Sequence, residues 1–289
     1  MENAKFCDLH LHSSCSDGSD SPEEFLRAVR KAGIGIFALT DHDTFDGVGA
    51  VEKLLAGMAD PPRFFRGIEF SCITGAGKVH ILGYQFDPES RVMAEAVAEG
   101  RRLREIKFER RLAHLEKWHG IRFTAEEMAY LKAQKSVGKP HLARLLVRRG
   151  LAPDISGAIR DYLDDHGGKD GTDVRIPAAM AIRAILDAGG LPVWAHPLGG
   201  EGEKHLTSAE FEGCLRELTA AGIRGLECYY SRYTAEEEAF LEEMADRHGL
   251  CRSGGSDYHG KNKDIPPGML REDNLTIPLQ KITILRHLI

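Results

Sequence analysis

Six separate segments of this sequence place histidine, aspartate or glutamate at or just beyond the end of a short apolar stretch. Together these positions supply six imidazoles and three carboxylates: His10, His12, Asp17, His42, Glu69, His80, His196, Asp257 and His259. Nine potential ligands are more than one metal ion can use, so the pattern predicts a multinuclear metal site. Sites of that kind usually hydrolyse phosphate esters.

Short apolar stretches alternate with amphipathic ones over most of the 289 residues, which favours an α/β fold with a parallel sheet. Ser21, Thr124 and Thr234 each precede a glutamate by three residues, and this spacing predicts capping boxes at three helix starts. We expect strands at residues 6–11, 34–40, 64–71, 79–84, 191–195, 223–229 and 250–255. In parallel α/β folds functional residues gather at the carboxyl ends of the strands, so ligands distant in sequence would meet on one face.

The spacing inside two of the segments supports shared coordination. Residues two apart in an extended strand point the same way. His10 and His12 can therefore reach one ion together, as can Asp257 and His259. A lone buried histidine is more often an ordinary core residue than a ligand, and we interpret the other seven histidines in that way. The recurrence of ligands at equivalent points is what indicates a metal site.

The alternation breaks between about residues 90 and 173, where helices are expected at 91–118, 125–134, 140–149 and 153–164. We interpret residues 91–173 as a helical insertion or lid domain in a catalytic domain formed by residues 1–90 and 174–289. Residues 100–150 hold 14 Lys and Arg against 5 Asp and Glu, a net charge of +9, so the rest of the chain carries −6 − 9 = −15. A positive surface beside a cleft attracts anionic substrates; the alternative is that these cations lie on ordinary solvated helix faces.

The bulk composition is that of a globular protein, with 42% apolar and 28% charged residues. No apolar run approaches membrane-spanning length, and the first residues lack the apolar stretch of a secretory signal. The six cysteines include no Cys-x-x-Cys pair and are expected to be reduced thiols. We therefore expect a cytoplasmic location, with no membrane association and no obligate protein partner.

The ordered motifs resemble those of the PHP (polymerase and histidinol phosphatase) family over residues 8–259. They are His10-x-His12, Asp17-Gly18, Thr40-Asp41-His42-Asp43, Gly67-Ile68-Glu69, His80, Ala195-His196-Pro197 and Gly255-Ser256-Asp257-x-His259. All nine metal positions of the trinuclear members of this family are filled. The resemblance implies a distorted (β/α)7 barrel with up to three divalent cations.

Position by position, the resemblance assigns each ligand to a metal. His10, His12, Glu69 and Asp257 would hold the first ion. Glu69 would bridge to a second ion held also by His80 and His196, and a third would be held by Asp17, His42 and His259. Mixed nitrogen and oxygen ligands suit Mn²⁺, Fe²⁺ or Zn²⁺ better than Ca²⁺.

These assignments lead to a mechanistic hypothesis of two-metal hydrolysis with a third ion assisting. A hydroxide that bridges the first two metals would attack phosphorus, and the cations would neutralise the phosphoryl oxygens. Glu69, His196, Asp257 and His259 are the residues expected to carry this chemistry. Asp41 and Asp43, beside His42, could orient imidazoles or simply cap their loop.

The substrate class is suggested by the insertion. It resembles the PHP branch that acts on nucleotides phosphorylated at both the 3′ and 5′ positions, or on the 5′ ends of RNA. The stretch 138–144 is similar to a lid motif of that branch, so Lys139, His141 and Arg144 are candidate anion contacts, with Arg232 as a fourth. The alternative is a helix N-terminus with surface cations.

At two places this sequence differs from the pattern of that branch, and both differences bear on whether it acts on the same substrates. Arg often stands in place of Lys139, and lysine binds phosphate as a point charge rather than through a fork. Gly168-Lys169-Asp170-Gly171-Thr172-Asp173 stands where a Gly-Lys-Pro-x-Tyr run is common.

Three competing functions remain open on the sequence. The first is a phosphatase for histidinol phosphate or another small molecule, which has little need for so long a basic insertion. The second is a metal-stabilised PHP module without catalysis, although such modules tend to lose ligands. The third is nucleic-acid binding without chemistry, for which the chain shows no recognisable module.

Overall fold

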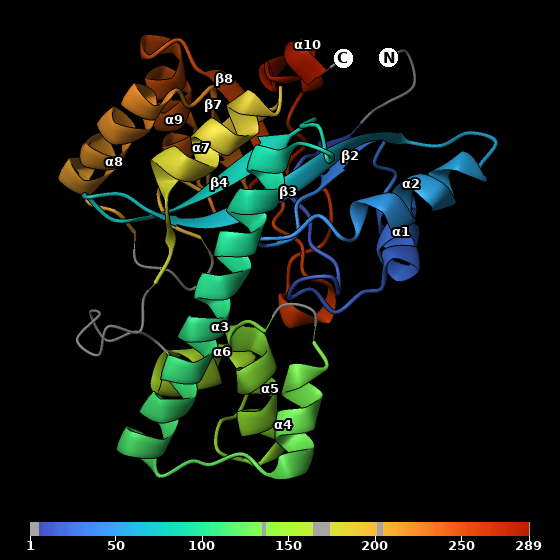
Figure 1. Cartoon of the computed structure of the whole chain (residues 1–289). Coiled ribbons are helices and arrows are strands. Elements are labelled where there is room, and N and C mark those ends of the chain that lie inside the picture. The colour runs from blue at the N-terminus through green and yellow to red at the C-terminus, as the bar shows by residue number, and fades with distance from the viewer. Residues whose placement is uncertain (1–5, 135–136, 164–173, 201–204, 289) are drawn as a thin grey trace.

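The computed structural model describes residues 6–134, 137–163, 174–200 and 205–288 (Figure 1). The strands are β1 (Cys7–Asp8), β2 (Ile36–Leu39), β3 (Arg63–Ile73), β4 (Lys78–Tyr84), β5 (Ile176–Pro177), β6 (Leu191–Ala195), β7 (Gly225–Tyr230) and β8 (Cys251–Gly255). The helices are α1 (Pro22–Lys31), α2 (Val48–Ala56), α3 (Arg91–His119), α4 (Ala125–Lys132), α5 (Lys139–Arg148), α6 (Ile155–Ala158), α7 (Ala178–Asp187), α8 (Ser208–Ala221), α9 (Ala235–Arg247) and α10 (Leu285–Leu288). A π-helical turn, η1 (Ile159–Leu163), continues α6, and short 3₁₀ turns lie at Gly260–Asn262 and Leu279–Lys281.

Seven strands form a nearly closed barrel in the order β1-β2-β3-β4-β6-β7-β8, and β5 pairs with β3. The barrel closes where the chain leaves β1 and β8. The Leu9 N–H donates to the carbonyl of Gly254 at 3.0 Å, and the Asp257 N–H donates to the carbonyl of His10 at 2.8 Å. Two predicted ligands, His10 and Asp257, therefore lie on the backbone that joins the first strand to the last.

Two features of the sheet differ from the sequence prediction. The strand expected at residues 6–11 pairs with β2 only at Cys7 and Asp8, because the chain beyond them turns to bond with the extension of β8. β4 runs antiparallel to both β3 and β6, although a parallel sheet was expected. The connection from β3 to β4 is only residues 74–77, and so short a loop can join only antiparallel neighbours.

Three helices, α1, α4 and α9, begin at the capping boxes that the sequence predicts. Ser21, Thr124 and Thr234 accept hydrogen bonds from the backbone N–H groups three residues on, and the matching glutamates bond back, so the three capping boxes are confirmed. Within the described ranges, no helix is both long and apolar enough to cross a membrane. The 29-residue α3 is long enough but is rich in charge.

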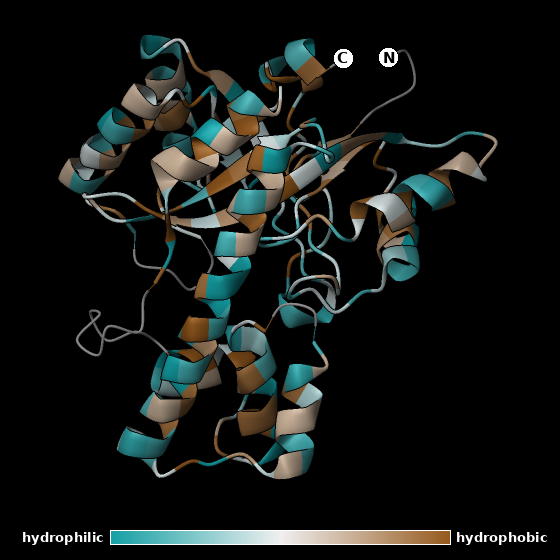
Figure 2. Ribbon diagram, viewed as in Figure 1, coloured by the Kyte–Doolittle hydropathy of each residue, from teal (hydrophilic) through white to brown (hydrophobic). Residues whose placement is uncertain are grey.

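α3 begins against the barrel and extends into a separate helical body with α4, α5, α6 and η1 (Figure 1). This lid has its own apolar cluster, which includes Leu115, Leu131, Leu142, Leu146 and Leu163. Figure 2 shows the apolar turns of these helices directed toward one another. The lid is thus a second packing unit, held apart from the two clusters that fill the barrel and its flanking helices.

Candidate metal centre

The nine predicted ligands lie at one end of the barrel. The strands and their extensions supply them as follows: His10 and His12 after β1, Asp17 in the next loop, His42 after β2, Glu69 in β3, His80 in β4, His196 after β6, and Asp257 and His259 after β8. His80 lies near the amino end of its strand, not the carboxyl end. Because β4 is antiparallel to its neighbours, its amino end meets the carboxyl ends of the others.

Glu69 lies at the centre of the group, and its side chain is fully buried. Its Oε2 atom lies 3.1, 3.1 and 3.2 Å from ring nitrogens of His10, His12 and His42. Its Oε1 atom lies 2.7 and 3.3 Å from ring nitrogens of His80 and His196. One carboxylate therefore faces five imidazoles, with its two oxygens directed at different sets, as a bridging ligand requires.

The other two carboxylates lie on either side of His259. Asp17 Oδ1 is 3.2 Å from His259 Nε2, and Asp17 Oδ2 is 3.9 Å from His42 Nε2. Asp257 Oδ1 is 3.4 Å from His259 Nδ1 and 3.3 Å from His12 Nε2. The three acids and six histidines thus form one continuous polar cluster.

Three subsets of this cluster could each hold a metal ion, with ligand atoms within 4.8 Å of one another. They are His10, His12, Glu69 and Asp257; His12, Asp17, His42 and His259; and His42, Glu69 and His80. His196 falls outside these subsets, although its Nε2 lies 3.3 Å from Glu69 Oε1. Both ring nitrogens of His12 and the Nδ1 of His42 are buried and, among the described residues, make no hydrogen bond of acceptable geometry, although carboxylate oxygens lie 3.1–3.3 Å from His12 Nε2 and His42 Nδ1. Buried unpartnered imidazole nitrogens beside carboxylates fit divalent cations, which would take up their lone pairs.

The cluster keeps its carboxylates ionised. Burial alone would raise their pKa values, but interactions with the neighbouring imidazoles and with Lys263 outweigh it. His42 and His259 lower the pKa of Asp17, His42 and His10 that of Glu69, and Lys263 and His259 that of Asp257, each to well below its usual range. Metal ligands must be deprotonated, so these acids are ready to coordinate at neutral pH.

The backbone is strained at three positions of the centre. Asp43, His196 and Asp257 have φ angles of 52°, 27° and 60°, in the left-handed region that residues other than glycine seldom adopt. Each carries a side chain that enters or borders the cluster. Strain of this kind concentrates at functional sites, where surrounding contacts hold the backbone in place.

Three further residues support the ligands and were not predicted from the sequence. Glu227, fully buried in β7, accepts from His10 Nδ1 at 3.0 Å and from the backbone N–H of His196 at 2.7 Å. Lys263 Nζ and the hydroxyl of Tyr230 donate to Asp257 Oδ2 at 2.6 and 3.1 Å. The sequence offers one indication of Glu227, because it is the only charged residue in the stretch 225–230.

The aspartates beside His42 hold the loops around the site. Asp41 accepts from the backbone N–H and hydroxyl of Ser13 and from the hydroxyl of Ser16. Asp43 accepts from the backbone N–H of Ser71 at 3.0 Å and from Arg104 at 2.6 Å. These bonds match the loop-capping alternative rather than the orientation of an imidazole.

The lid segment that contains Lys139, His141 and Arg144 begins beside the metal cluster. Gly138, which precedes Lys139, lies so near Asp17 that a Cβ on it would be 3.3 Å from the Asp17 Cβ. His141 is buried, and its Nδ1 accepts from the Gly138 N–H at 3.0 Å. Arg144 donates to Asn262, which in turn donates to the carbonyl of Asp17 at 2.7 Å.

The fourth candidate, Arg232, lies on the barrel. It donates to the carbonyl of Asp264 at 3.3 Å. The run 168–173, where the sequence departs from the related branch, lies outside the described residues.

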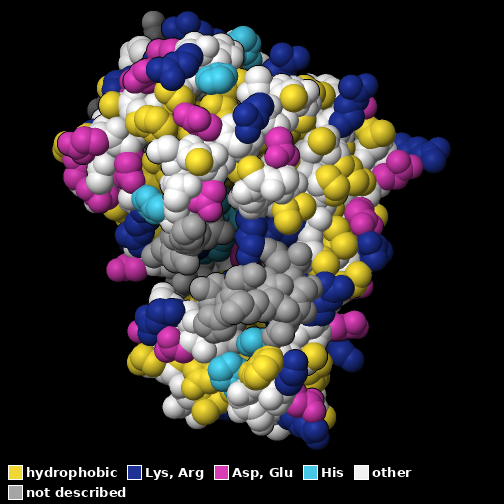
Figure 3. Space-filling model, turned by 90° about the vertical axis from the view of Figure 1, so that its left-hand side faces the viewer, with side chains coloured by type: hydrophobic (Ala, Val, Ile, Leu, Met, Phe, Trp, Pro, Cys, Tyr) yellow, Lys and Arg dark blue, Asp and Glu magenta, His cyan; other side chains and the backbone are white. Residues whose placement is uncertain are grey.

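Two further arginines, which no sequence motif indicates, also border the cluster. Arg104 of α3 bonds Asp43, the neighbour of His42, and donates to the hydroxyl of Ser71 at 3.2 Å. Arg175, just before β5, places Nη1 2.8 Å from Nε2 of His80. In Figure 3, Lys and Arg side chains lie in the hollow between the upper body and the lower one. Arginine side chains therefore border the approach to the centre, and positive charge in such a position attracts anions.

Comparison with known proteins agrees with this geometry. Residues 8–169, more than half of the chain, match the family model described as the PHP domain. The chain belongs to the PHP domain family. The match begins at Asp8 and takes in the first six of the nine predicted ligands together with most of the lid.

Characterised relatives cover nearly the whole chain. A 3′,5′-nucleoside bisphosphate phosphatase of Chromobacterium violaceum is 30% identical over 275 residues, which are 90% of this chain and 92% of the relative. A phosphoribosyl 1,2-cyclic phosphate 1,2-diphosphodiesterase of Eggerthella lenta is 30% identical, with coverages of 90% and 96%. A 5′-3′ exoribonuclease of Haemophilus influenzae is 30% identical, with coverages of 89% and 94%. This PHP protein is therefore a metal-dependent phosphoesterase.

Solved structures share the whole architecture. One, described as an amidohydrolase of Chromobacterium violaceum with bound sulfate and no metal, has a TM-score of 0.82 at 29% identity and covers 98% of this chain and 95% of its own. Another, from Bifidobacterium adolescentis, bears the description of an inferred metal-dependent phosphoesterase. Its TM-score is 0.78 at 26% identity, with coverages of 97% and 96%. This chain therefore shares its overall architecture with both of these structures.

Substitution Glu227→Gln is expected to weaken divalent-metal binding about 10- to 100-fold, as loss of a ligand's hydrogen-bond partner usually does. Glu227 accepts from His10 Nδ1, which fixes the tautomer whose Nε2 lone pair faces Glu69. The side-chain amide of glutamine can accept a hydrogen bond only at its oxygen. Its N–H₂ group would therefore face a second donor, either His10 Nδ1–H or the backbone N–H of His196. Metal dissociation constants measured by titration check this. Glu242→Gln, which removes a carboxylate that bonds Tyr229 outside the centre, is the control; equal affinities in the two variants would contradict the prediction.

Proposed function

We propose that this protein hydrolyses a phosphate ester of a nucleotide, either a 3′,5′-bisphosphate or the 5′ end of a short oligonucleotide, in the cytoplasm. The observation that carries the proposal is the cluster of nine potential metal-ligating side chains beside a basic lid. The named activities of the relatives from Chromobacterium violaceum and Haemophilus influenzae point to the same substrate class.

We further propose up to three divalent cations per chain, Mn²⁺, Fe²⁺ or Zn²⁺. The first would be held by His10, His12, Glu69 and Asp257, which form one of the three ligand subsets. Glu69 with His80 and His196 would hold the second, and Asp17, His42 and His259 the third. The close spacing of these three sets around Glu69 supports a shared centre.

When bound, such cations neutralise phosphoryl oxygens and lower the pKa of water. The protein's own residues prepare the site for that chemistry. Glu69 and Asp257 stay ionised, and His196 and His259 complete the ligand shells without adding negative charge. Glu227 holds a proton at His10 Nδ1, while Lys263 and Tyr230 fix the orientation of Asp257. We assign the chemistry to Glu69, His196, Asp257 and His259.

Binding of the substrate is assigned to the lid and to one barrel loop. Lys139, His141, Arg144 and Arg232 are the proposed anion contacts. The nearness of Gly138 to Asp17 supports this assignment for the start of α5. We propose that residues 91–173 act as a lid domain on the catalytic barrel of residues 1–90 and 174–289; the separate apolar cluster of the lid supports this division.

The test is phosphate release by the Mn²⁺-loaded protein from 3′,5′-bisphosphorylated adenosine, a short 5′-phosphorylated RNA and histidinol phosphate, assayed side by side. We expect kcat/KM for at least one of the two nucleotide substrates to exceed that for histidinol phosphate about 100-fold or more, because these substrates carry more negative charge for the basic lid to attract. Faster turnover of histidinol phosphate than of both nucleotide substrates would overturn the substrate assignment. Metal-dependent phosphate-ester hydrolysis at the barrel would still hold. Hydrolysis of none would contradict the proposed function as a whole.

A further inference from the structure

The lid contains a cavity of about 490 Å³ between α3 and α4. The residues of α3 that line it are Arg101, Arg104, Glu105, Phe108, Glu109 and Leu112. Arg101, Arg104 and Phe108 are spaced three and four apart and so share one face of the helix. Met128 and Lys132 of α4 line the opposite side. The volume falls in the range of about 300–1,000 Å³ that is usual for small-molecule sites.

The cavity adjoins the metal centre along two of its edges. On the first edge, Arg104 bonds Asp43, which follows the ligand His42, and Arg101 donates to the hydroxyl of Thr44 at 2.7 Å. On the second edge, Val137 lines the cavity and is followed by Gly138, which lies against the ligand Asp17. A molecule whose phosphate lies at the centre could therefore extend directly into this cavity.

The chemistry of the lining changes with distance from the centre. Arg101 and Arg104 lie at the end of the cavity that meets the barrel. Phe108 and Leu112 follow at four-residue intervals on α3, or about 6 Å each at 1.5 Å per residue, and both pack against the apolar cluster of the lid. Arg101 pairs with Asp46 and Arg104 with Asp43, and the exposed carboxylates of Glu105 and Glu109 also line the cavity. The two arginines beside the metal centre, with an aromatic ring and apolar neighbours beyond them, match the order of parts in a nucleotide, a phosphate followed by a base.

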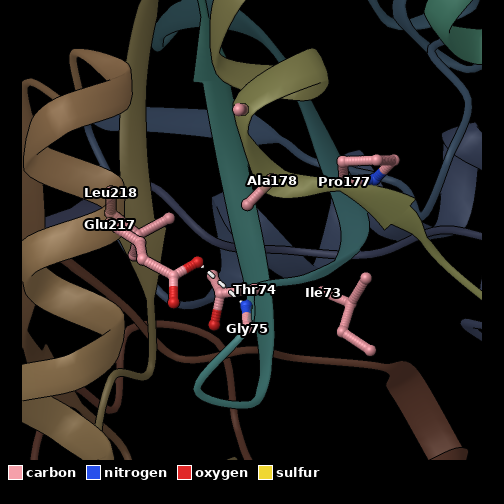
Figure 4. Close-up of a pocket in the computed structure, with 8 residues that line it drawn as sticks. Ile73, Thr74, Gly75, Pro177, Ala178, Glu217 and Leu218 are labelled. Carbon is pink, nitrogen blue, oxygen red and sulfur yellow. Dashed lines mark hydrogen bonds between the residues drawn. The ribbon is translucent and has the colours of Figure 1, made fainter.

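A second cavity shows what is special about the first. It has a volume of about 370 Å³ and is lined by residues such as Ile73, Pro177, Ala178 and Leu218 (Figure 4). Its acidic residue, Glu217, accepts from the backbone N–H of Gly75 at 2.8 Å. Among the described residues that line it there is no lysine, arginine or aromatic side chain. It offers nothing that would attract a nucleotide.

We propose that the cavity between α3 and α4 binds the nucleobase of the substrate, with Phe108 as the stacking platform and Arg104 at the junction between base and phosphate. This assignment rests on the proposed function and specifies its substrate as a base-bearing phosphate ester. Stacking on an aromatic ring tolerates every base, because each has a π face. Adenosine and cytidine bisphosphates should therefore differ less in kcat/KM than either differs from a compound without a base.

The experiment compares 3′,5′-bisphosphorylated adenosine with 1,2-dideoxyribose 3,5-bisphosphate, which carries the same phosphates without a base. For the Mn²⁺-loaded full-length protein we expect kcat/KM to favour the nucleotide about 5- to 150-fold, the contribution of one stacked base. Phe108→Leu keeps an apolar side chain but removes the ring, and should bring this ratio close to one through a higher KM for the nucleotide. Phe108→Tyr, which keeps the ring, should preserve the ratio.

Phe123→Leu is the matched control, because Phe123 packs on the same apolar cluster of the lid without lining the cavity. It should leave the ratio as in the unaltered protein. A ratio near one in the unaltered protein, or equal changes in the Phe108→Leu and Phe123→Leu variants, would overturn the base site while the proposed function stands. If neither compound is hydrolysed, the proposed function fails, and the dissociation constants of the two compounds for the same variants still decide the base site.

Discussion

The Glu69→Gln variant is expected to lose at least about 1,000-fold in kcat for phosphate release, equivalent to about 4 kcal/mol of transition-state stabilisation. Glu69 is fully buried, and its two oxygens face five imidazoles at 2.7 to 3.3 Å. Glutamine preserves the volume but removes the charge and turns an N–H₂ donor toward nitrogens whose lone pairs are needed. Loss of a partner outside the ligand set usually costs about 10- to 100-fold, and loss of the central ligand should cost more.

Two measurements separate this result from simple misfolding. Metal content per chain should fall together with phosphate release, while the far-ultraviolet circular dichroism spectrum should stay that of the unaltered protein. Glu52→Gln is the control, since it removes a carboxylate that is 40% exposed and paired with Arg66 on the barrel exterior. Turnover by Glu69→Gln within tenfold of the control, with metals bound, would show that hydrolysis does not depend on this carboxylate.

The clustering of the nine polar residues was predictable because most of them occupy positions that the strand pattern defines. A polar residue such as His42 or His196 directly after an apolar strand has few structural explanations, and the parallel strands bring such positions together. His80 was harder to place, since the sequence suggested a parallel strand. The length of the connection between the two strands indicates the true direction of β4. Residues 74–77 are only four residues, which is too few to join two parallel neighbours.

The supporting residues could not be derived in the same way. Lys263 reaches Asp257 from a 3₁₀ turn region six residues further on, and Arg104 reaches Asp43 from a helix 61 residues away in sequence. No spacing rule links such pairs; only the packed fold places them in contact. The lid cavity is a similar case, because Phe108 and Met128 read in the sequence as ordinary core residues of two amphipathic helices.

Substitution Gly255→Ala is expected to lower the free energy of unfolding by about 3 kcal/mol or more, at or above the upper end of the usual cost of overpacking. A Cβ at residue 255 would lie 2.1 Å from the Cβ of His10 and 2.5 Å from its backbone nitrogen. Contacts that short do not occur, so the segment around His10 would have to move. That segment closes the barrel against β8 and carries a proposed metal ligand, so stability and metal affinity should fall together.

Gly49→Ala provides the comparison, because nothing lies within 4 Å of the added Cβ and the residue is inside α2. Alanine in a helix should leave stability unchanged or raise it by up to about 1 kcal/mol. Urea unfolding of both variants in the presence of a chelator removes the contribution of bound metal, and metal titration then measures the effect on the centre. Equal midpoints for the two variants would mean that the chain can separate His10 from β8 at no cost, and would remove the link between barrel closure and the metal site.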